Sequence, residues 1–190
     1  VGYPPEDLLH RQGFLTQAKQ ECSRIQQTLK ESIGDTAVVF GLPYEHAGEL
    51  YNAAVHLHRG SIMKFYFKQS LPNYSVFDEL RYFSAGTEAA VIDVRGHKIG
   101  LLICEDVWQS ELVKQSKDCG SQAIIVLNAS PFHIGKHQER IDVLQEHAQR
   151  FDIPIMYLNM IGGQDELVFD GDSLAMNRQG ELIVRAGLFE

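Results

Sequence analysis

The sequence predicts an α/β fold in which mixed sheets are covered by helices. Short apolar runs typical of buried strands alternate with amphipathic helical segments in the middle of the chain, and hairpin patterns are inserted between them. The chain has 190 residues, of which 44% are apolar, so it can bury a substantial core and is not predominantly disordered.

The first elements predicted are a helix and a buried strand. Apolar residues recur at intervals of three and four from Leu15 to Leu29, which indicates an amphipathic helix that ends near Gly34. Residues 37–41 are fully apolar and precede Leu42-Pro43, so we expect a short buried strand that ends in a loop, as in a parallel sheet.

Two hairpins are predicted where turn residues separate two strand patterns. The turns are Arg59-Gly60 and Arg95-Gly96-His97. The flanking strands are 51–57 with 61–67, and 89–94 with 98–103.

Helix and strand patterns alternate over the rest of the chain. No repeat or linker divides it, so the sequence is interpreted as one domain, residues 1–190. The expected elements are a helix from about 108 to 119, a strand at 123–128, a helix from about 136 to 151, a strand at 155–159 and short antiparallel strands at 167–169, 173–176 and 182–184.

Composition excludes several classes of protein. No apolar run approaches the roughly 18 to 20 residues that a membrane-spanning helix needs. The net charge of -8, without a basic stripe, argues against a nucleic-acid partner. Three cysteines are too few for a disulfide framework, so we expect a cytoplasmic protein with reduced thiols.

Cys104 is a candidate nucleophile because it follows a buried strand and precedes a helix. Ligands of α/β sheets gather at the carboxyl ends of strands, and amide donors at a helix start favour a thiolate. The alternative is that Cys104 is one more small buried residue, as we expect for Cys22 and Cys119 on the apolar faces of helices.

Lys68 and Glu79 carry chemistry only if the fold brings them to a site. Taken alone, Lys68 lies on the wet face of a hairpin and Glu79 lies in a polar turn, so each would be solvated. An ammonium near a thiol would lower the pKa of that thiol and stabilise an oxyanion.

No metal or nucleotide site is expected in this segment. Two histidine pairs, His56 with His58 and His133 with His137, have no third ligand at a telling spacing. The glycines at 162–163 do not form a phosphate-binding loop.

Four motifs together resemble the nitrilase-type glutaminase domain of glutamine-dependent NAD synthetase. They occur in the order of that family and extend over almost the whole chain. They are GYPPEDLL at 2–9, KQSLPNYSVFDE at 68–79, ICEDVW at 103–108 and GGQDELVFDG at 162–171.

The resemblance implies a four-layer αββα sandwich with mixed sheets that hydrolyses the side-chain amide of glutamine. Cys104 matches the nucleophile, Lys68 the lysine that stabilises the tetrahedral intermediate, and Glu79 the glutamate that holds this lysine. The residues that match glutamine contacts are Tyr74, Glu105, Ser130 and Lys136, the last standing where some relatives have an arginine.

The resemblance also implies parts that the printed chain does not contain. The family's general base is a glutamate in a Pro-Glu motif shortly before Gly2, so the start looks trimmed, a first strand is expected to be missing, and this segment alone is expected to be inactive. A synthetase domain that uses ATP and Mg is expected downstream of Glu190. The remaining expectations are no cofactor within residues 1–190, glutamine and the synthetase domain in cis as partners, and a homo-oligomer.

Two other functions stay open at this point. The chain could be a stand-alone nitrilase-type amidase for another small amide, or an assembly module that lacks one catalytic carboxylate. The Asn73-Tyr74 segment and residues 163–166 favour the synthetase.

Overall fold

A long helix and a three-stranded antiparallel sheet form the first of two compact units, residues 1–88. The computed structural model describes residues 2–32 and 35–190 of the chain. The elements of the first unit, with η marking a 3-10 helix, are η1 (Glu6–His10), α1 (Gln12–Ser32), β1 (Ala37–His46), β2 (Glu49–His58), β3 (Ser61–Phe67) and η2 (Glu79–Arg81).

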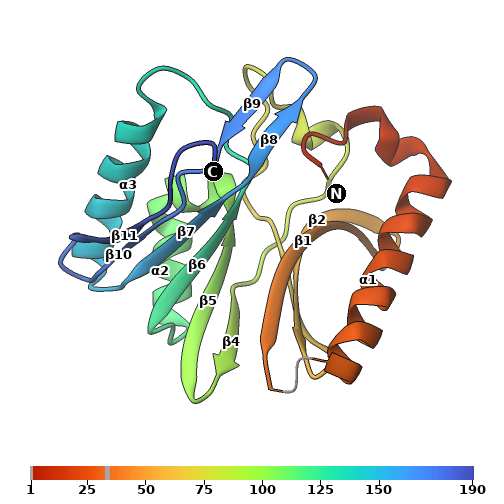
Figure 1. Cartoon of the computed structure of the whole chain (residues 1–190), viewed down its shortest axis with the longest axis horizontal. Helices are drawn as coiled ribbons and strands as arrows, with labels where there is room; N and C mark the ends of the chain where they lie inside the picture. The colour runs from red at the N-terminus through yellow and green to blue at the C-terminus, as the bar shows by residue number, and fades with distance from the viewer. Residues whose placement is uncertain (1, 33–34) are drawn as a thin grey trace. The chain divides into compact units, whose positions relative to one another are not determined.

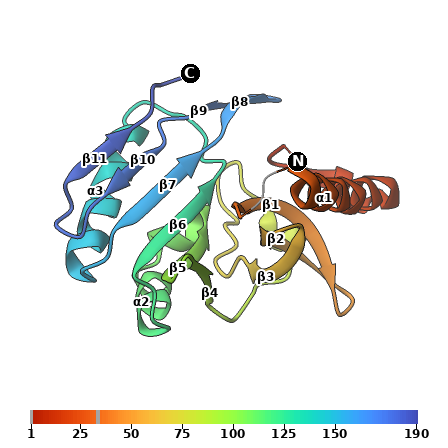
Figure 2. The same ribbon diagram turned by 60° about the horizontal axis from the view of Figure 1, so that its bottom comes forward.

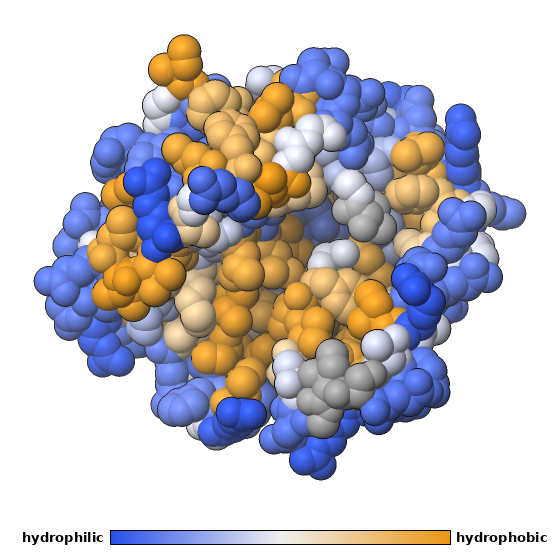
Figure 3. All heavy atoms as spheres, in the orientation of Figure 1, coloured by the Kyte–Doolittle hydropathy of each residue, from blue (hydrophilic) through white to orange (hydrophobic). Residues whose placement is uncertain are grey.

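The helix α1 packs its apolar stripe against this sheet (Figure 1). Cys22 and Leu29 from the helix are buried together with Leu42, Val55 and Leu57 from β1 and β2, and burial raises the pKa of the Cys22 thiol. The predicted helix is therefore confirmed, whereas its expected end near Gly34 lies outside the described residues. Most residues of α1 are exposed, and hydrophilic residues dominate along it in the space-filling view (Figure 3).

The prediction for β1 is wrong in length and in pairing. The strand does not end at Gly41 but continues to His46, and it pairs antiparallel with β2 over its whole length. Pro43 suggested a strand end because proline cannot donate to a ladder. Since β1 lies at the edge of its sheet, a proline there is tolerated.

The second unit, residues 89–190, is built on a six-stranded mixed sheet in the order β11-β10-β7-β6-β5-β4. The three strands β5, β6 and β7 run parallel, and the other pairs are antiparallel. Its elements are β4 (Ala90–Val94), β5 (His97–Ile103), η3 (Cys104–Trp108), α2 (Ser110–Asp118), β6 (Ala123–Asn128), α3 (Lys136–Arg150), β7 (Ile155–Asn159), β8 (Ile161–Gln164), β9 (Leu167–Asp170), β10 (Leu174–Met176) and β11 (Leu182–Arg185).

The helices α2 and α3 lie on the same face of this sheet (Figure 2). Gly100 in β5 allows α2 a close approach, because a Cβ atom there would collide with the hydroxyl groups of Ser116 and Ser121. These two hydroxyl groups are buried and 2.9 Å apart. The predicted mixed sheet with covering helices is confirmed.

Two predictions for the second unit need correction. Cys119 does not belong to the core: α2 ends at Asp118, and Cys119 is exposed in the turn that follows. The strand β8 was not predicted, because Gly162 and Gly163 give its sequence a weak strand propensity. It forms a separate hairpin with β9.

Within residues 2–32 and 35–190 the structure has no helix with the length and apolar character needed to cross a membrane.

Candidate active site

Cys104 lies at the point where β5 ends and η3 begins. The end of β5 is buried, and Cys104 itself is half-buried with a φ of 46°, a left-handed conformation that non-glycine residues rarely adopt. The fully buried Asp106 carboxylate accepts the Ile103 backbone N–H at 2.9 Å and so stabilises the turn. A strained backbone that its surroundings hold in place is typical of functional sites, which favours a functional role for this thiol.

The carboxyl ends of three parallel strands bring further polar residues to the same edge of the sheet. Ile103 is in register with Leu127 of β6, and Asn128 with Asn159 of β7. Ser130, two residues beyond β6, therefore belongs to the same sheet edge as Cys104. This edge is where α/β sheets bind ligands.

Ser130 is part of a buried group of four polar residues, which we call the Ser130 cluster: Ser130, Arg140, Asn159 and Asp170. Arg140 donates to the two carboxylate oxygens of Asp170, each at 2.9 Å. Its Nη2 also donates to the carbonyl oxygen of Ser130 at 3.0 Å and to the hydroxyl oxygen at 3.2 Å. The Ser130 N–H donates to Asn159 Oδ1 at 2.9 Å, so the N–H, the carbonyl oxygen and the hydroxyl oxygen of Ser130 all have hydrogen-bond partners within the cluster.

Burial and neighbouring charges decide the protonation states of the buried side chains of Arg140 and Tyr157. Burial alone would lower the pKa of Arg140, but the hydrogen bonds to Asp170 and the electrostatic interactions with Tyr157, Asp170 and Asp172 more than offset it and raise the pKa. Burial raises the pKa of Tyr157, and the electrostatic interaction with the nearby Cys104 acts in the same direction. Arg140 is therefore a permanent cation and Tyr157 a neutral phenol in the surroundings of Cys104.

Lys136, the first residue of α3, contacts the turn that carries Cys104. Its ammonium lies 4.0 Å from the centre of the Trp108 ring, a cation–π contact, and 3.2 Å from a carboxylate oxygen of Glu139. Glu105, next to Cys104, is half-buried. The roles of Lys136 and Glu105 as glutamine contacts stay predictions.

Lys68 and Glu79 form a buried ion pair in the first unit. Lys68 is 1% exposed and Glu79 4%, so neither is solvated as each residue taken alone would suggest. The Lys68 ammonium lies 2.8 Å from each carboxylate oxygen of Glu79. The pairing implied by the resemblance is thus present, and the catalytic role of the two residues stays a prediction.

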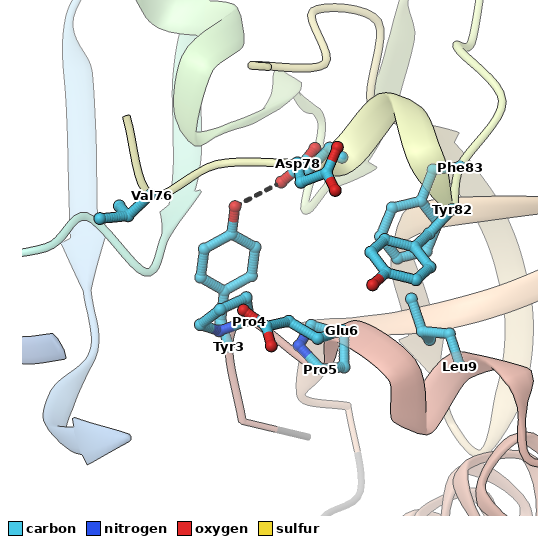
Figure 4. A pocket seen from close by; sticks show the side chains of 10 residues that line it. Tyr3, Pro4, Pro5, Glu6, Leu9, Val76, Asp78, Tyr82 and Phe83 are labelled. Atoms are coloured by element: carbon cyan, nitrogen blue, oxygen red, sulfur yellow. Dashed lines mark hydrogen bonds between the residues drawn. The ribbon is translucent and has the colours of Figure 1, made fainter. Parts of the chain in front are cut away.

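Two further side chains hold the Glu79 carboxylate. The Tyr3 hydroxyl donates to Glu79 Oε1 at 2.8 Å, the dashed contact in Figure 4, and Asn52 Nδ2 donates to the same oxygen at 3.4 Å. Beside Tyr3 there is a cavity of about 20 Å³, which is room for about one water molecule.

Backbone hydrogen bonds fix Lys68 and Glu79 in place. The Lys68 N–H donates to the carbonyl of Asn52 at 2.9 Å, which continues the pairing of β3 with β2, and the Gly86 N–H donates to the carbonyl of Lys68 at 2.8 Å. The Glu79 N–H donates to the carbonyl of Pro72 at 3.1 Å, and this hydrogen bond joins the two ends of the loop 72–79.

Tyr74 lies in that same loop and is 55% exposed. Its ring meets Phe77 edge-on, with ring centres 5.5 Å apart. The role of Tyr74 as a glutamine contact stays a prediction.

Sequence reasoning missed the residues that support these sites. Tyr3 belongs to a motif quoted above, but no pattern linked it to Glu79, which is 76 positions away. Arg140 lies among the charged residues of α3, and Asn159 and Asp170 end β7 and β9 as ordinary polar residues do. In residues 2–32 and 35–190 no three His, Cys, Asp or Glu side chains are grouped to hold a metal ion.

Comparison with known proteins identifies close relatives of the whole segment. A family model described as carbon-nitrogen hydrolase matches residues 5–190. The glutamine-dependent NAD(+) synthetases of Acinetobacter baylyi and Aquifex aeolicus are 42% and 43% identical over 100% of this chain, covering 34% and 33% of the relative. The chain therefore spans about a third of the length of these curated relatives.

Solved structures agree with the sequence comparison. A glutamine-dependent NAD+ synthetase from Acinetobacter baumannii, in complex with adenosine diphosphate, matches 100% of this chain and 35% of its own, with a TM-score of 0.91 and 39% identity. An amidase from Nesterenkonia matches 98% of this chain and 69% of its own, with a TM-score of 0.86 and 24% identity, which shows the fold alone. The expected nitrilase-like α/β fold is confirmed.

Proposed function

Because the chain belongs to the carbon-nitrogen hydrolase family, we propose that it is the glutaminase part of a glutamine-dependent NAD synthetase. In this role it hydrolyses the side-chain amide of glutamine to glutamate and ammonia. The observation that carries the proposal is the similarity of 42% to 43% identity over the entire chain to proteins of that name.

The first step of the proposed reaction is attack on the amide. The Cys104 thiolate donates an electron pair to the amide carbon of glutamine, and the C=O electrons move to oxygen, which gives a tetrahedral intermediate. The Lys68 ammonium and the backbone N–H of Glu105 donate to the developing oxyanion. An ammonium has three N–H donors, so its pair with Glu79 leaves capacity for this oxygen.

The second step releases ammonia and regenerates the thiolate. The carbon–nitrogen bond breaks as the nitrogen takes up a proton, ammonia departs and a thioester remains. Water then attacks the thioester carbon, the carbon–sulfur bond breaks and glutamate leaves. We assign the general base that moves these protons to none of residues 1–190, because the resemblance implies a glutamate for this role ahead of Gly2.

The activity of the whole protein is part of the same proposal. Ammonia would serve the ATP-dependent amidation of deamido-NAD to NAD in a synthetase domain, a ligase that binds ATP and Mg. We further expect a cytoplasmic protein that assembles as a homo-oligomer.

Replacement of Cys104 by serine in the full-length protein tests the proposal. We expect glutamine-driven NAD formation to be abolished and ammonia-driven formation to be retained, because only the first half reaction needs the thiol. Cys119→Ser, which removes an exposed thiol, is the matched control and should change neither rate. An equal loss of both rates in Cys104→Ser would show that Cys104 does not belong to a glutaminase.

A labelling experiment addresses the thiol directly. An electrophile that mimics glutamine should modify Cys104 selectively and be blocked by excess glutamine. Equal labelling of all three cysteines, or protection by another small amide but not by glutamine, would contradict a glutamine site.

A further inference from the structure

The Ser130 cluster contains a buried ion pair that the proposed chemistry does not use. Arg140, from α3, and Asp170, from the end of β9, have fully buried side chains, and their two parallel hydrogen bonds are each 2.9 Å long. A buried ion pair is weak evidence for stability, because the desolvation of two charges can exceed their attraction. The pair therefore calls for another explanation.

The geometry of the guanidinium supplies one. Arginine is planar and presents its donors in a rigid fork, so once Asp170 fixes the fork, the remaining donor directions are fixed too. One N–H of Nη2 donates to Asp170, and the other is shared between the carbonyl oxygen and the hydroxyl oxygen of Ser130. Asn159 fixes the backbone N–H of Ser130 from β7 and also donates to the carbonyl of Gly171 at 2.9 Å.

These contacts give the Ser130 hydroxyl a defined direction. Since its oxygen accepts from a permanent cation, its own hydrogen points away from Arg140 and is a donor for the oxygen of the neighbouring Tyr157 hydroxyl or for that of a ligand. A hydroxyl that donates recognises an oxygen acceptor, such as the carboxylate or the carbonyl of an amino acid. The carboxyl ends of β5, β6 and β7 place this hydroxyl at the same sheet edge as Cys104.

We propose that Arg140, held by Asp170, is a positioning residue that orients Ser130 as a hydrogen-bond donor to glutamine, an inference that rests on the proposed function. Arg140 touches neither the substrate nor the reacting atoms. Its contribution is to the binding of glutamine and not to the chemistry at Cys104.

The double variant Arg140→Met/Asp170→Leu in the full-length protein separates positioning from a structural role. Replacement of a buried ion pair by apolar residues of similar volume is often neutral for stability, so the fold should persist. We expect a rise in KM for glutamine of about tenfold, with kcat changed less than about threefold, because one oriented donor is lost in binding. Ammonia-driven NAD formation and the rate of Cys104 alkylation by iodoacetamide should match the wild type.

A normal KM in a folded double variant would overturn the inference, since the ion pair would then be only structural. A loss of kcat with unchanged KM, or slower alkylation of Cys104, would overturn it as well. If the wild-type protein forms NAD from ammonia but not from glutamine, the proposed function fails instead, so the two failures are distinguishable.

A thermodynamic cycle with Ser130→Ala and Arg140→Lys covers the case in which the double variant does not fold. If Arg140 acts through Ser130, the rise in KM of the combined variant should be no larger than that of the stronger single variant. Multiplication of the two effects would overturn the inference. Arg150→Lys is the matched control, because Arg150 lies on the same helix, is exposed and contacts only its helix neighbours Glu146, at 3.8 Å, and Phe151, with 5.2 Å to the ring centre, among the contacts described.

Discussion

In the part of the chain that the structure describes, each unit contains an ion pair with both side chains buried, and the two pairs are built differently. In the first unit both oxygens of Glu79 contact a single nitrogen, Lys68 Nζ. In the second unit two nitrogens of Arg140 face the two oxygens of Asp170, and one of them continues to Ser130.

The difference indicates a division of labour. An ammonium is a compact point charge that can be directed at one developing negative atom, which suits the stabilisation of an oxyanion. A guanidinium spreads its charge over a rigid fork, which suits the alignment of several neutral groups. We therefore expect changes in the Lys68 pair to lower kcat, and changes in the Arg140 pair to raise KM.

The largest effect should come from Lys68→Met. Loss of one oxyanion donor costs about 3 to 4 kcal/mol, so the kcat of glutamine hydrolysis should fall about 10²- to 10³-fold. Steady-state ammonia release measures this, with Lys64→Met on the exposed part of β3 as the control. A rise in KM at unchanged kcat would contradict the distinction between the two ion pairs, because that result is expected for changes at Arg140 and not for changes at Lys68.

Glu79→Gln should have the next largest effect. The amide leaves the Lys68 ammonium buried opposite a neutral group, so we expect a loss of stability of about 3 to 5 kcal/mol and a fall in kcat of about 10- to 100-fold. Chemical unfolding and glutamine turnover are the two measurements. Asp170→Asn is the matching variant in the second unit. An equal fall in kcat in both variants would contradict the expectation that only the Lys68 pair affects kcat.

Tyr3→Phe should have a smaller effect of the same kind. It deletes one hydrogen bond to the Glu79 carboxylate and keeps the ring in place, so stability should fall by about 1 kcal/mol and kcat by about two- to tenfold. Tyr82→Phe, whose hydroxyl donates to the exposed Asp7, serves as the control. A Tyr3→Phe enzyme with wild-type kcat and stability would show that Glu79 needs no third support.

The smallest effect concerns pH and compares a buried histidine in each unit. Burial lowers the pKa of His56 in β2 and of His147 in α3, so the unfolded chain binds protons more readily than the folded one. The contribution of each neutral imidazole to stability is therefore present above about pH 6.5 and is lost as the pH falls below that value.

Thermal unfolding between pH 7.5 and 5.5 measures this loss. We expect a lower Tm at the acidic end, and a flatter dependence in His147→Gln and in His56→Gln. His97→Gln, at an exposed position in β5, should leave the wild-type slope unchanged. An unaltered slope in both buried-site variants would show that these histidines do not control acid stability.

Local patterns predicted most of the fold because they reflect local physics. The period of α1 and the turn at Arg59-Gly60 follow from short-range sterics and amphipathicity, and β6 and β7 agree with their predicted ranges. The pattern was misleading where tertiary context decided. Pro43 is tolerated because β1 is an edge strand, and Cys119 is exposed because α2 ends one residue before it.

The sequence by itself determined the α/β class, the order of the elements and the resemblance that singled out Cys104, Lys68 and Glu79. Only the tertiary structure decided that Lys68 and Glu79 are buried against each other, and that Ser130 is held by Arg140, Asn159 and Asp170. The physical reason is that burial and hydrogen bonding of a charged side chain depend on partners far away in the chain. A residue such as Arg140 looks like any solvated helix residue until the fold places Asp170 opposite it, 30 positions further along the chain.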